Sequence, residues 1–189
     1  CDDDQVDLSN LQRQIIHNTD SMGADKVESA RHSLLKINPD IKITCFNHRL
    51  NDEQLSQQID LADVVVDASD NFNTRFLINK ISVKNKTPLV SGAAIKTEGQ
   101  VSVFNQTETS PCYHCLYHDN GKEMDTTCSS NGILAPVVGI IGSIQALEAL
   151  KIIAQFGDTL DGRVQLLDAF SMEWQQMKLK KDPDCPVCS

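Results

Sequence analysis

Ala62-Asp63-Val64-Val65-Val66-Asp67 contains three consecutive valines, a pattern that identifies a β-strand of an α/β protein. Strands buried on both faces of a parallel sheet read as continuous apolar runs, whereas half-exposed strands alternate apolar and polar residues. The next segment, from Asn71 to about Lys84, is predicted to be helical. A buried parallel strand followed directly by a helix is the repeating unit of an α/β fold.

Helices and strands alternate on both sides of this strand. Upstream we predict a helix over residues 25–38 that ends at Pro39, a strand over 41–46 and a short helix over 52–59. Downstream we predict strands over 88–91, 100–104, 163–168 and 173–179, and a helix that ends near Gln155. This order predicts one α/β domain over residues 1–189, with a mixed, mainly parallel sheet flanked by helices.

Composition and charge exclude several classes of protein. The chain has 189 residues, 40% hydrophobic and 23% charged, which is ordinary for a soluble domain with a substantial core. Its net charge of −9 and the lack of a basic stripe argue against nucleic-acid binding, because phosphates need Lys and Arg. The uncharged stretch from Cys128 to Leu147 contains Pro136 and Gly139, and its strongly apolar part, Ile133 to Ile141, is too short to span a membrane. We therefore predict a core helix there.

Two Cys-x-x-Cys pairs, Cys112/Cys115 and Cys185/Cys188, have the spacing of a four-thiolate zinc site. A proline stands beside each pair, so each is predicted to lie in a turn. A redox motif is the weaker alternative, since one pair would suffice and neither pair is expected to open a helix after a strand. Disulfides fit poorly because seven cysteines are an odd number and no secretory signal is visible. The pattern predicts structural Zn²⁺ in a cytoplasmic protein. His114 could replace one of the first two cysteine ligands, but a solvated loop side chain is the favoured interpretation of this residue.

Residues Cys1 to Asp4 resemble the carboxyl end of a strand, with three aspartates in a row. Such an acidic residue normally binds the ribose of a nucleotide, about twenty residues after a Gly-rich phosphate loop. No Gly-x-Gly-x-x-Gly motif occurs in these 189 residues. We therefore expect an N-terminal βαβ unit with this loop to be missing from the sequence.

Several motifs occur in the order found in the ThiF/MoeB/HesA family of bacterial E1-like enzymes. They are Ser9-Asn10-Leu11-Gln12-Arg13-Gln14, Lys26-Val27-Glu28-Ser29-Ala30, Asp67-Ala68-Ser69-Asp70-Asn71, Ser91-Gly92-Ala93-Ala94, Glu98-Gly99-Gln100 and the two cysteine pairs. The chain resembles this family from Asp2 to Cys188. The resemblance implies a Rossmann-like E1 fold with a four-cysteine zinc staple. It also implies an ATP- and Mg²⁺-dependent adenylyltransferase that activates the C-terminal Gly-Gly of a ThiS- or MoaD-like sulfur carrier, for thiamine or molybdopterin biosynthesis.

The resemblance also implies roles for individual residues. The nucleotide-binding set is Asp2, Ser9, Asn10, Leu11, Gln12, Arg13, Lys26, Asp70 and Asn71. Within this set Arg13 and Lys26 are expected to contact phosphates, Asp2 the ribose and Asp70 the Mg²⁺, with Arg13 and Asp70 catalytic.

Simpler roles for the same residues stay open. Arg13 and Lys26 are alternatively solvated surface charges. Asn10 alternatively caps a turn, and Ser69 or Asp70 alternatively caps the following helix. Asp4 is expected to be a solvated neighbour of Asp2, and Asp67 is a weaker candidate behind Asp70.

Cys128 lies between Thr127 and Ser129, in the long polar stretch from Gln106 to Asn131. It matches the loop cysteine that ThiF-type enzymes use in sulfur transfer, so it is a candidate catalytic nucleophile, with an inert thiol as the alternative. The resemblance further implies a homodimer and a sulfur donor such as a cysteine desulfurase. Two other functions stay open, namely a non-catalytic zinc-stapled interaction module and a dinucleotide-dependent oxidoreductase.

Overall fold

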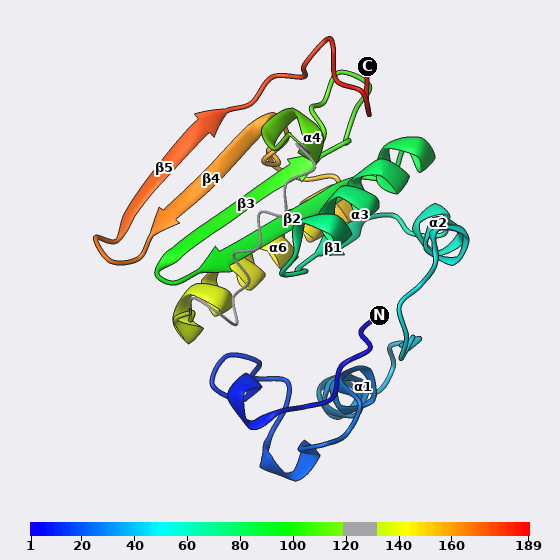
Figure 1. Ribbon diagram of the computed structural model, residues 1–189, viewed down its shortest axis with the longest axis vertical. Coiled ribbons are helices and arrows are strands. Elements are labelled where there is room, and N and C mark those ends of the chain that lie inside the picture. Colours follow the sequence, from blue (N-terminus) through cyan, green and yellow to red (C-terminus); the bar gives the residue numbers. More distant parts are fainter. Residues whose placement is uncertain (119–131) are drawn as a thin grey trace. The chain divides into compact units, whose positions relative to one another are not determined.

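The computed structural model describes residues 1–118 and 132–189, which form two compact units, Cys1–Glu53 and Gln54–Ser189. The larger unit is built on a five-stranded sheet in which the strands lie side by side in chain order, β1-β2-β3-β4-β5 (Figure 1). The strands are β1 (Val65–Asp67), β2 (Leu89–Ile95), β3 (Glu98–Phe104), β4 (Arg163–Asp168) and β5 (Glu173–Lys178).

The sheet is mixed, as predicted, but it is not mainly parallel. β1 pairs with β2 in parallel, whereas β2–β3, β3–β4 and β4–β5 are antiparallel. The short connections from β2 to β3 and from β4 to β5 explain two of these three pairings, because a tight turn can join only antiparallel neighbours. The parallel β–α–β repeat predicted from the valine run therefore occurs once among the described strands.

β1 is more exposed than its sequence predicts. Within the larger unit it pairs only with β2, and it forms the edge of the sheet. Val66 is accordingly 49% exposed, so the expectation of burial on both faces is wrong. Asp67, the last residue of the strand, is instead buried.

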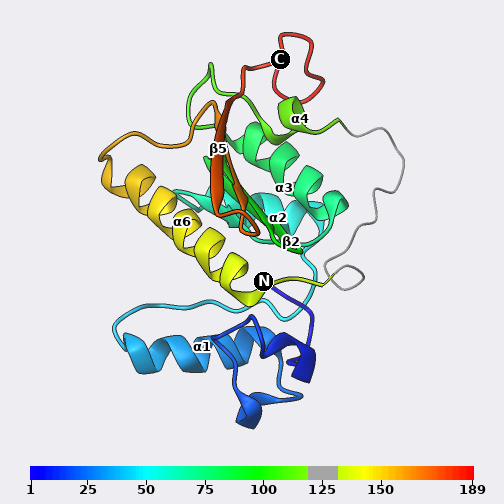
Figure 2. The ribbon, with the colours of Figure 1, turned by 90° about the vertical axis from the view of Figure 1, so that its left-hand side faces the viewer.

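Helices cover both faces of this sheet (Figure 2). α6 (Ala135–Ala154) lies on one face, and α3 (Phe72–Asn85) and α4 (Tyr113–Leu116) lie on the other. Successive residues of a strand point to opposite faces, so each strand supplies both layers of the core. The layer against α6 is formed by Val90, Val101, Val103, Val137 and Ile141, and the other layer contains Leu89, Phe104 and Tyr113.

α6 is long and apolar enough, by length and composition alone, to cross a membrane, a test that core helices of soluble proteins also pass. Its buried residues are Val137, Ile141, Gln145, Glu148 and Ala149, which form the side that packs against the sheet. The prediction of a core helix is therefore confirmed for this side. The predicted end near Gln155 is also confirmed, because Gln155 adopts a left-handed conformation and caps the helix.

The smaller unit contains α1 (Lys26–Ile37) and two short 3-10 helices, η1 (Leu8–Asn10) and η2 (Thr19–Ser21). α1 confirms the helix predicted over residues 25–38, and α2 (Asp52–Asp60) confirms the next one. The strand predicted over 41–46 is wrong. Alternating residues form a strand only beside a partner, and the one backbone hydrogen bond described for this segment joins Asp2 N to Phe46 O at 3.1 Å.

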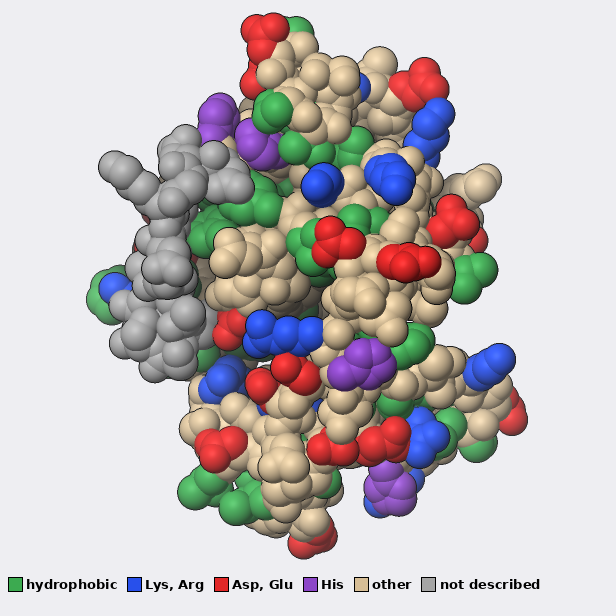
Figure 3. Space-filling view, turned by 45° about the vertical axis from the view of Figure 1, so that its right-hand side comes forward, with side chains coloured by type: hydrophobic (Ala, Val, Ile, Leu, Met, Phe, Trp, Pro, Cys, Tyr) green, Lys and Arg blue, Asp and Glu red, His purple; other side chains and the backbone are tan. Residues whose placement is uncertain are grey.

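Charged side chains of both signs are interspersed on the surface. On the face shown in Figure 3, Lys and Arg alternate with Asp and Glu and form no continuous basic patch among the side chains described. This mixed distribution agrees with the net charge of −9.

Candidate active site and metal centre

Lys26 and the acidic start of the chain form an ion pair in the smaller unit. Lys26 Nζ lies 2.6 Å from Asp4 Oδ2, and the Lys26 side chain is only 12% exposed. Lys26 is therefore held in place rather than solvated, and Asp4 is its partner rather than a mere neighbour of Asp2. The Oδ1 atom of Asp2 accepts a hydrogen bond from Asp4 N at 2.9 Å, which links the first residues to one another. The role of Asp4 was not predicted, because the two partners are 22 positions apart.

The segment from Ser9 to Arg13 forms a capped turn. Asp7 caps η1 by accepting a hydrogen bond from Ser9 N at 2.8 Å, and the hydrogen bonds from Ser9 lower the pKa of Asp7. The Oδ1 atom of Asn10 in return accepts from Asp7 N at 3.1 Å, so the alternative in which Asn10 caps a turn is confirmed. Arg13 donates from Nη1 to Ser9 O at 2.9 Å, while Leu11 and Gln12 continue the turn. The predicted nucleotide-binding stretch is thus one ordered turn.

Asp70 and Asn71 follow the carboxyl end of β1, but they differ in role. Asn71 is the N-cap of α3, with Oδ1 accepting from Thr74 N at 2.9 Å. The expectation that Ser69 or Asp70 caps this helix is therefore wrong, because the helix begins one residue later. Asp70 is exposed, and its carboxylate contacts Asn71 Nδ2 at 3.4 Å. This arrangement leaves the Asp70 charge outside the helix cap.

A buried polar network holds the turn before Asp70. Asp67 Oδ1 accepts from the backbone and hydroxyl of Ser69 at 2.9 and 2.7 Å, and Oδ2 accepts from the Ser91 hydroxyl at 3.3 Å. From α6, Gln145 donates to Asp67 O at 2.7 Å. Sequence reasoning missed Gln145, although a glutamine within the mainly apolar helix α6 was a usable signal. Asp67 thus supports the turn and does not face the solvent.

Gly92 is expected to be required by the close approach of Gln145. A Cβ atom at Gly92 would lie 2.3 Å from Gln145 Cδ, which is far inside van der Waals contact. We expect Gly92→Ala to lower the free energy of unfolding by about 1–3 kcal/mol, because overpacking displaces the buried amide. Denaturant unfolding of the parent and the variant measures this difference in free energy. Gly139→Ala is the control, because its Cβ would meet nothing within 4 Å and alanine favours the exposed helix. Equal stability of the two variants would contradict the role of Gly92.

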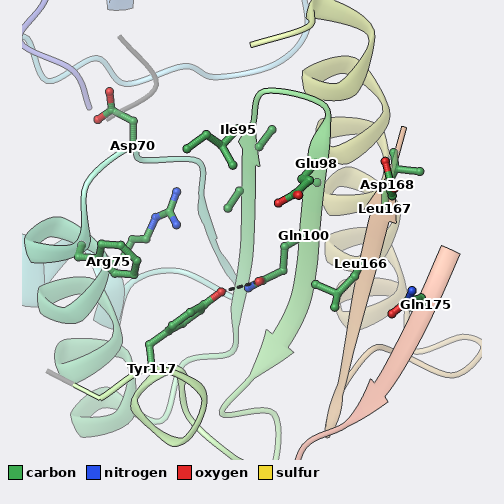
Figure 4. A pocket seen from close by; sticks show the side chains of 14 residues that line it. Asp70, Arg75, Ile95, Glu98, Gln100, Tyr117, Leu166, Leu167, Asp168 and Gln175 are labelled. Atoms are coloured by element: carbon green, nitrogen blue, oxygen red, sulfur yellow. Dashed lines mark hydrogen bonds between the residues drawn. The ribbon is translucent and has the colours of Figure 1, made fainter. Parts of the chain in front are cut away.

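A cavity of about 500 Å³ lies between α3 and the sheet of the larger unit, with Asp70 among its lining residues (Figure 4). Arg75 extends into it from α3, and Gln100 faces it from β3. The Tyr117 hydroxyl donates to Gln100 Oε1 at 2.6 Å and so links the segment after α4 to the strand. The cavity therefore combines the carboxylates of Asp70, Glu98 and Asp168 with a guanidinium and amide groups, in a space that suits a small polar ligand.

Arg75 is a candidate functional residue that sequence reasoning missed. Its Nε donates to Ser69 O at 3.0 Å, and its guanidinium lies 5.8 Å above the Phe72 ring. These contacts orient the side chain toward the cavity beside Asp70. The signal in the sequence was weak. Arg75 stands one helical turn after the cap residue Asn71, where its direction depends on the neighbouring strand.

The four cysteines of the predicted metal site come together in the larger unit. Their Sγ atoms all lie within 4.8 Å of one another, with separations of 3.7 Å for Cys112–Cys185, 3.9 Å for Cys112–Cys115 and 3.5 Å for Cys115–Cys188. A tetrahedral site with metal–sulfur bonds of about 2.3 Å has sulfur–sulfur edges of about 3.8 Å. A disulfide would need about 2.05 Å. The geometry therefore fits four thiolates around one metal ion.

The surroundings of the cysteines differ from the prediction in one respect. Cys112 is the N-cap of α4 and Cys115 lies within it, so the first pair opens a short helix rather than lying in a turn. The second pair lies in turns, as predicted. Burial raises the pKa of the Cys112 thiol to about 11, so a thiolate there depends on a nearby cation. The Nδ1 atom of His114 lies 3.9 Å from Cys185 Sγ, beside the four sulfur atoms.

Cys128 lies outside the described residues, as does the rest of 119–131. Its catalytic role therefore stays a prediction from the resemblance. Of the polar stretch from Gln106 to Asn131, the structure describes residues 106–118, which contain α4.

Known proteins match the whole chain. The ThiF family model matches residues 1–187. The molybdopterin-synthase adenylyltransferase of Salmonella typhimurium is 44% identical over 187 residues, which cover 99% of this chain and 75% of that protein. The sulfur carrier protein ThiS adenylyltransferase of Escherichia coli is 40% identical over 188 residues, covering all of this chain and 74% of that protein.

A solved structure agrees with the fold. The crystal structure of Escherichia coli MccB with ATP superposes with a TM-score of 0.83 at 23% identity, over 99% of this chain. The chain spans 58% of the length of that structure, so this likeness concerns the fold alone. The family match over residues 1–187 and the relatives at 40% and 44% identity show that the chain belongs to the ThiF family.

Proposed function

We propose that this chain acts as an ATP-dependent adenylyltransferase that activates the C-terminal carboxylate of a ubiquitin-like sulfur carrier, of the ThiS or MoaD type. The observation that carries the proposal is the full-length similarity, at 40% and 44% identity, to two enzymes named for this reaction. A carboxylate oxygen of the carrier attacks the α-phosphorus of ATP. Pyrophosphate leaves, and an acyl-adenylate remains for sulfur transfer in thiamine or molybdopterin biosynthesis.

The chemistry of the candidate residues supports this reaction. Two anions meet when a carboxylate attacks a phosphate, so the enzyme must supply positive charge. Arg13 and Lys26 are proposed phosphate contacts, the first through its forked donors and the second as a point charge. Asp2 is the proposed ribose ligand, and the turn from Ser9 to Gln12 is proposed to contact the nucleotide.

Asp70 is the proposed magnesium ligand. A carboxylate oxygen is the kind of ligand that Mg²⁺ prefers, and Asp70 is exposed at the wall of the cavity. Bound Mg²⁺ would neutralise charge on the phosphates. Arg75 contributes a fixed positive charge to the same cavity, where it is suited to hold the attacking carboxylate of the carrier.

Zinc is the proposed metal of the four cysteines. Four thiolates at tetrahedral spacing are the ligand set of structural zinc sites, with no position left open for a substrate. The site ties α4 to the segment that ends the chain, since Cys112 and Cys185 are 73 positions apart. We therefore assign Zn²⁺ a structural role. A homodimer, a sulfur donor such as a cysteine desulfurase and a cytoplasmic location are further proposals from the resemblance.

ATP–pyrophosphate exchange tests the proposed reaction. The protein is incubated with ATP, Mg²⁺, labelled pyrophosphate and either a ThiS-type or a MoaD-type carrier. Exchange that depends on one carrier is expected. The identity of that carrier shows whether the enzyme acts in thiamine or in molybdopterin biosynthesis. A carrier that lacks its terminal glycine is the control. No exchange with either intact carrier would overturn the proposal.

Cys128→Ser is expected to separate adenylation from sulfur transfer. Adenylation needs only ATP, Mg²⁺ and the carrier carboxylate, so exchange should stay at the parent rate. Formation of the carrier thiocarboxylate, measured by intact mass, should fall in a ThiF-like enzyme because the thiol takes part in sulfur transfer. Cys45→Ser, at a thiol that donates to Val27 O in the smaller unit, is the matched control. An unchanged thiocarboxylate yield would show that Cys128 is dispensable and would favour a MoeB-like route.

A further inference from the structure

We propose that His17 and Ser29 are positioning residues, whose side-chain hydrogen bond holds Arg13 and Lys26 at the spacing that lets them bind the phosphates of one nucleotide. This role rests on the nucleotide-binding roles proposed for Arg13 and Lys26. All four residues belong to the smaller unit, where two segments carry them. Arg13 and His17 stand on the stretch after η1, whereas Lys26 and Ser29 stand at the start of α1.

A buried hydrogen bond joins these two segments. The Nδ1 atom of His17 lies 2.8 Å from the Ser29 hydroxyl oxygen, and the two residues are only 9% and 8% exposed. Polar side chains buried to this degree need a partner inside the protein, because water cannot replace a bond that is lost there. The contact between His17 and Ser29 therefore fixes where the stretch after η1 meets α1.

A second serine holds the same stretch one turn further along α1. The Ser33 hydroxyl donates to the carbonyl oxygen of Ile16 at 2.7 Å. Residues three and seven positions after Lys26 lie on the same side of a helix, so Lys26, Ser29 and Ser33 share one side of α1. The stretch that carries Arg13 is thus bound to the side of α1 that carries Lys26.

Backbone hydrogen bonds connect His17 to Arg13. His17 N donates to Gln14 O at 3.0 Å, and the carbonyl oxygen of Asn10 accepts from Arg13 N at 3.0 Å and from Gln14 N at 2.9 Å. Arg13 also donates from Nη1 to Ser9 O, within the same turn. A displacement of His17 would therefore move this turn and the guanidinium of Arg13 with it.

The charge state of His17 suits this supporting role. Burial, followed by the positive charge of Lys26, holds the pKa of His17 below its usual value, and the carboxylate of Asp2 opposes them. The ring is therefore mainly neutral at pH 7 and bonds Ser29 without adding a third positive charge. Arg13 and Lys26 repel each other, so a rigid neutral support is what keeps both in place for one polyphosphate.

Ser29→Ala and His17→Ala provide the test, since each removes one side of the hydrogen bond. Ser29→Ala should fold, because alanine is the best helix former. We expect the dissociation constant of ATP to rise about tenfold in either variant, because the two cations no longer keep their spacing. Isothermal titration calorimetry with Mg²⁺ and without a carrier measures this constant.

Two further readouts distinguish positioning from a general effect on folding. The double variant should bind ATP no more weakly than the single variants, because all three lack the same bond. His17→Asn, which places a polar atom near the position of Nδ1, should recover most of the affinity. In ATP–pyrophosphate exchange, the KM for ATP should rise while the KM for the carrier stays within about twofold of the parent.

His32→Ala is the matched control. His32 is an exposed histidine of the same helix, and its removal should leave ATP affinity within about twofold of the parent. A fall in kcat with unchanged ATP affinity and KM in the Ser29 and His17 variants would reduce the pair to a structural contact. That result would overturn the positioning role.

The same measurements separate this role from the adenylation reaction. A parent protein that binds ATP but exchanges no pyrophosphate with either carrier would overturn the reaction, while ATP affinities would still decide the role of His17 and Ser29. Unchanged ATP affinity in variants of an active parent would overturn the positioning role alone. A parent protein that binds no ATP would overturn both.

Discussion

Asp70→Asn is expected to abolish most carrier-dependent ATP–pyrophosphate exchange, with a loss of about 10²- to 10³-fold, the usual effect of removing one group that stabilises transition-state charge. The substitution keeps the size of the side chain but removes the negative charge proposed to hold Mg²⁺. Stability should hardly change, because Asp70 is exposed and the α3 cap belongs to Asn71. Exchange kinetics over a range of Mg²⁺ concentrations, together with thermal unfolding, measure both effects.

A matched substitution separates this role from a general effect of charge. Asp63→Asn removes the same charge from an exposed residue just before β1, outside the cavity lining. It should leave exchange within about twofold of the parent, since screened surface charges act weakly at a distance. An Asp70→Asn enzyme that works near the parent rate would refute the metal role. A large fall in its melting temperature would show that Asp70 acts on folding.

Cys188→Ser is expected to cost the protein its zinc and about 4 kcal/mol or more of unfolding free energy, an effect typical of a lost structural metal. The substitution leaves three thiolates, and the hydroxyl of serine is a poor ligand for a site built from sulfur. Zinc should fall from one ion per chain to almost none in elemental analysis. Denaturant unfolding with and without a chelator should show that the parent, but not the variant, depends on the metal.

Cys45→Ser controls for the loss of a thiol as such. Cys45 donates to Val27 O in the smaller unit and is outside the four-sulfur cluster. It should keep one zinc ion per chain. A parent protein purified without chelator that contains no zinc would rule out the four-thiolate assignment.

Patterns of neighbouring residues were enough to predict the helices. Apolar residues at helical spacing, with Pro39 as a stop, located α1 to within one residue at each end. The same holds for α2, α3 and the end of α6. Helices are formed by hydrogen bonds between residues four positions apart, so nearby residues determine where a helix begins and ends. The cysteine spacing likewise predicted that the four sulfur atoms come together, because each pair needs only a short segment to present two sulfur atoms.

Strand pairing could not be predicted in the same way. A valine run indicates a strand but not its neighbours, which is why β1 turned out to be an exposed edge and why three of the four pairings are antiparallel. Residues 41–46 alternate like a strand but pair with no strand in the described part of the chain. Hydrogen bonds of a sheet connect residues that are distant in the chain, and loop lengths decide which of these can meet.

The sequence by itself determined the family, the helices, the four cysteines and the position of Asp70 at the end of a strand. Only the tertiary structure decided which polar side chains support them. Gln145 beneath Gly92, Arg75 in the cavity and Asn79 at the start of α4 have no motif of their own. Their importance comes from burial and from contacts with residues on other elements. A buried amide or guanidinium must find its partner wherever the chain brings one, and this information is absent from local sequence.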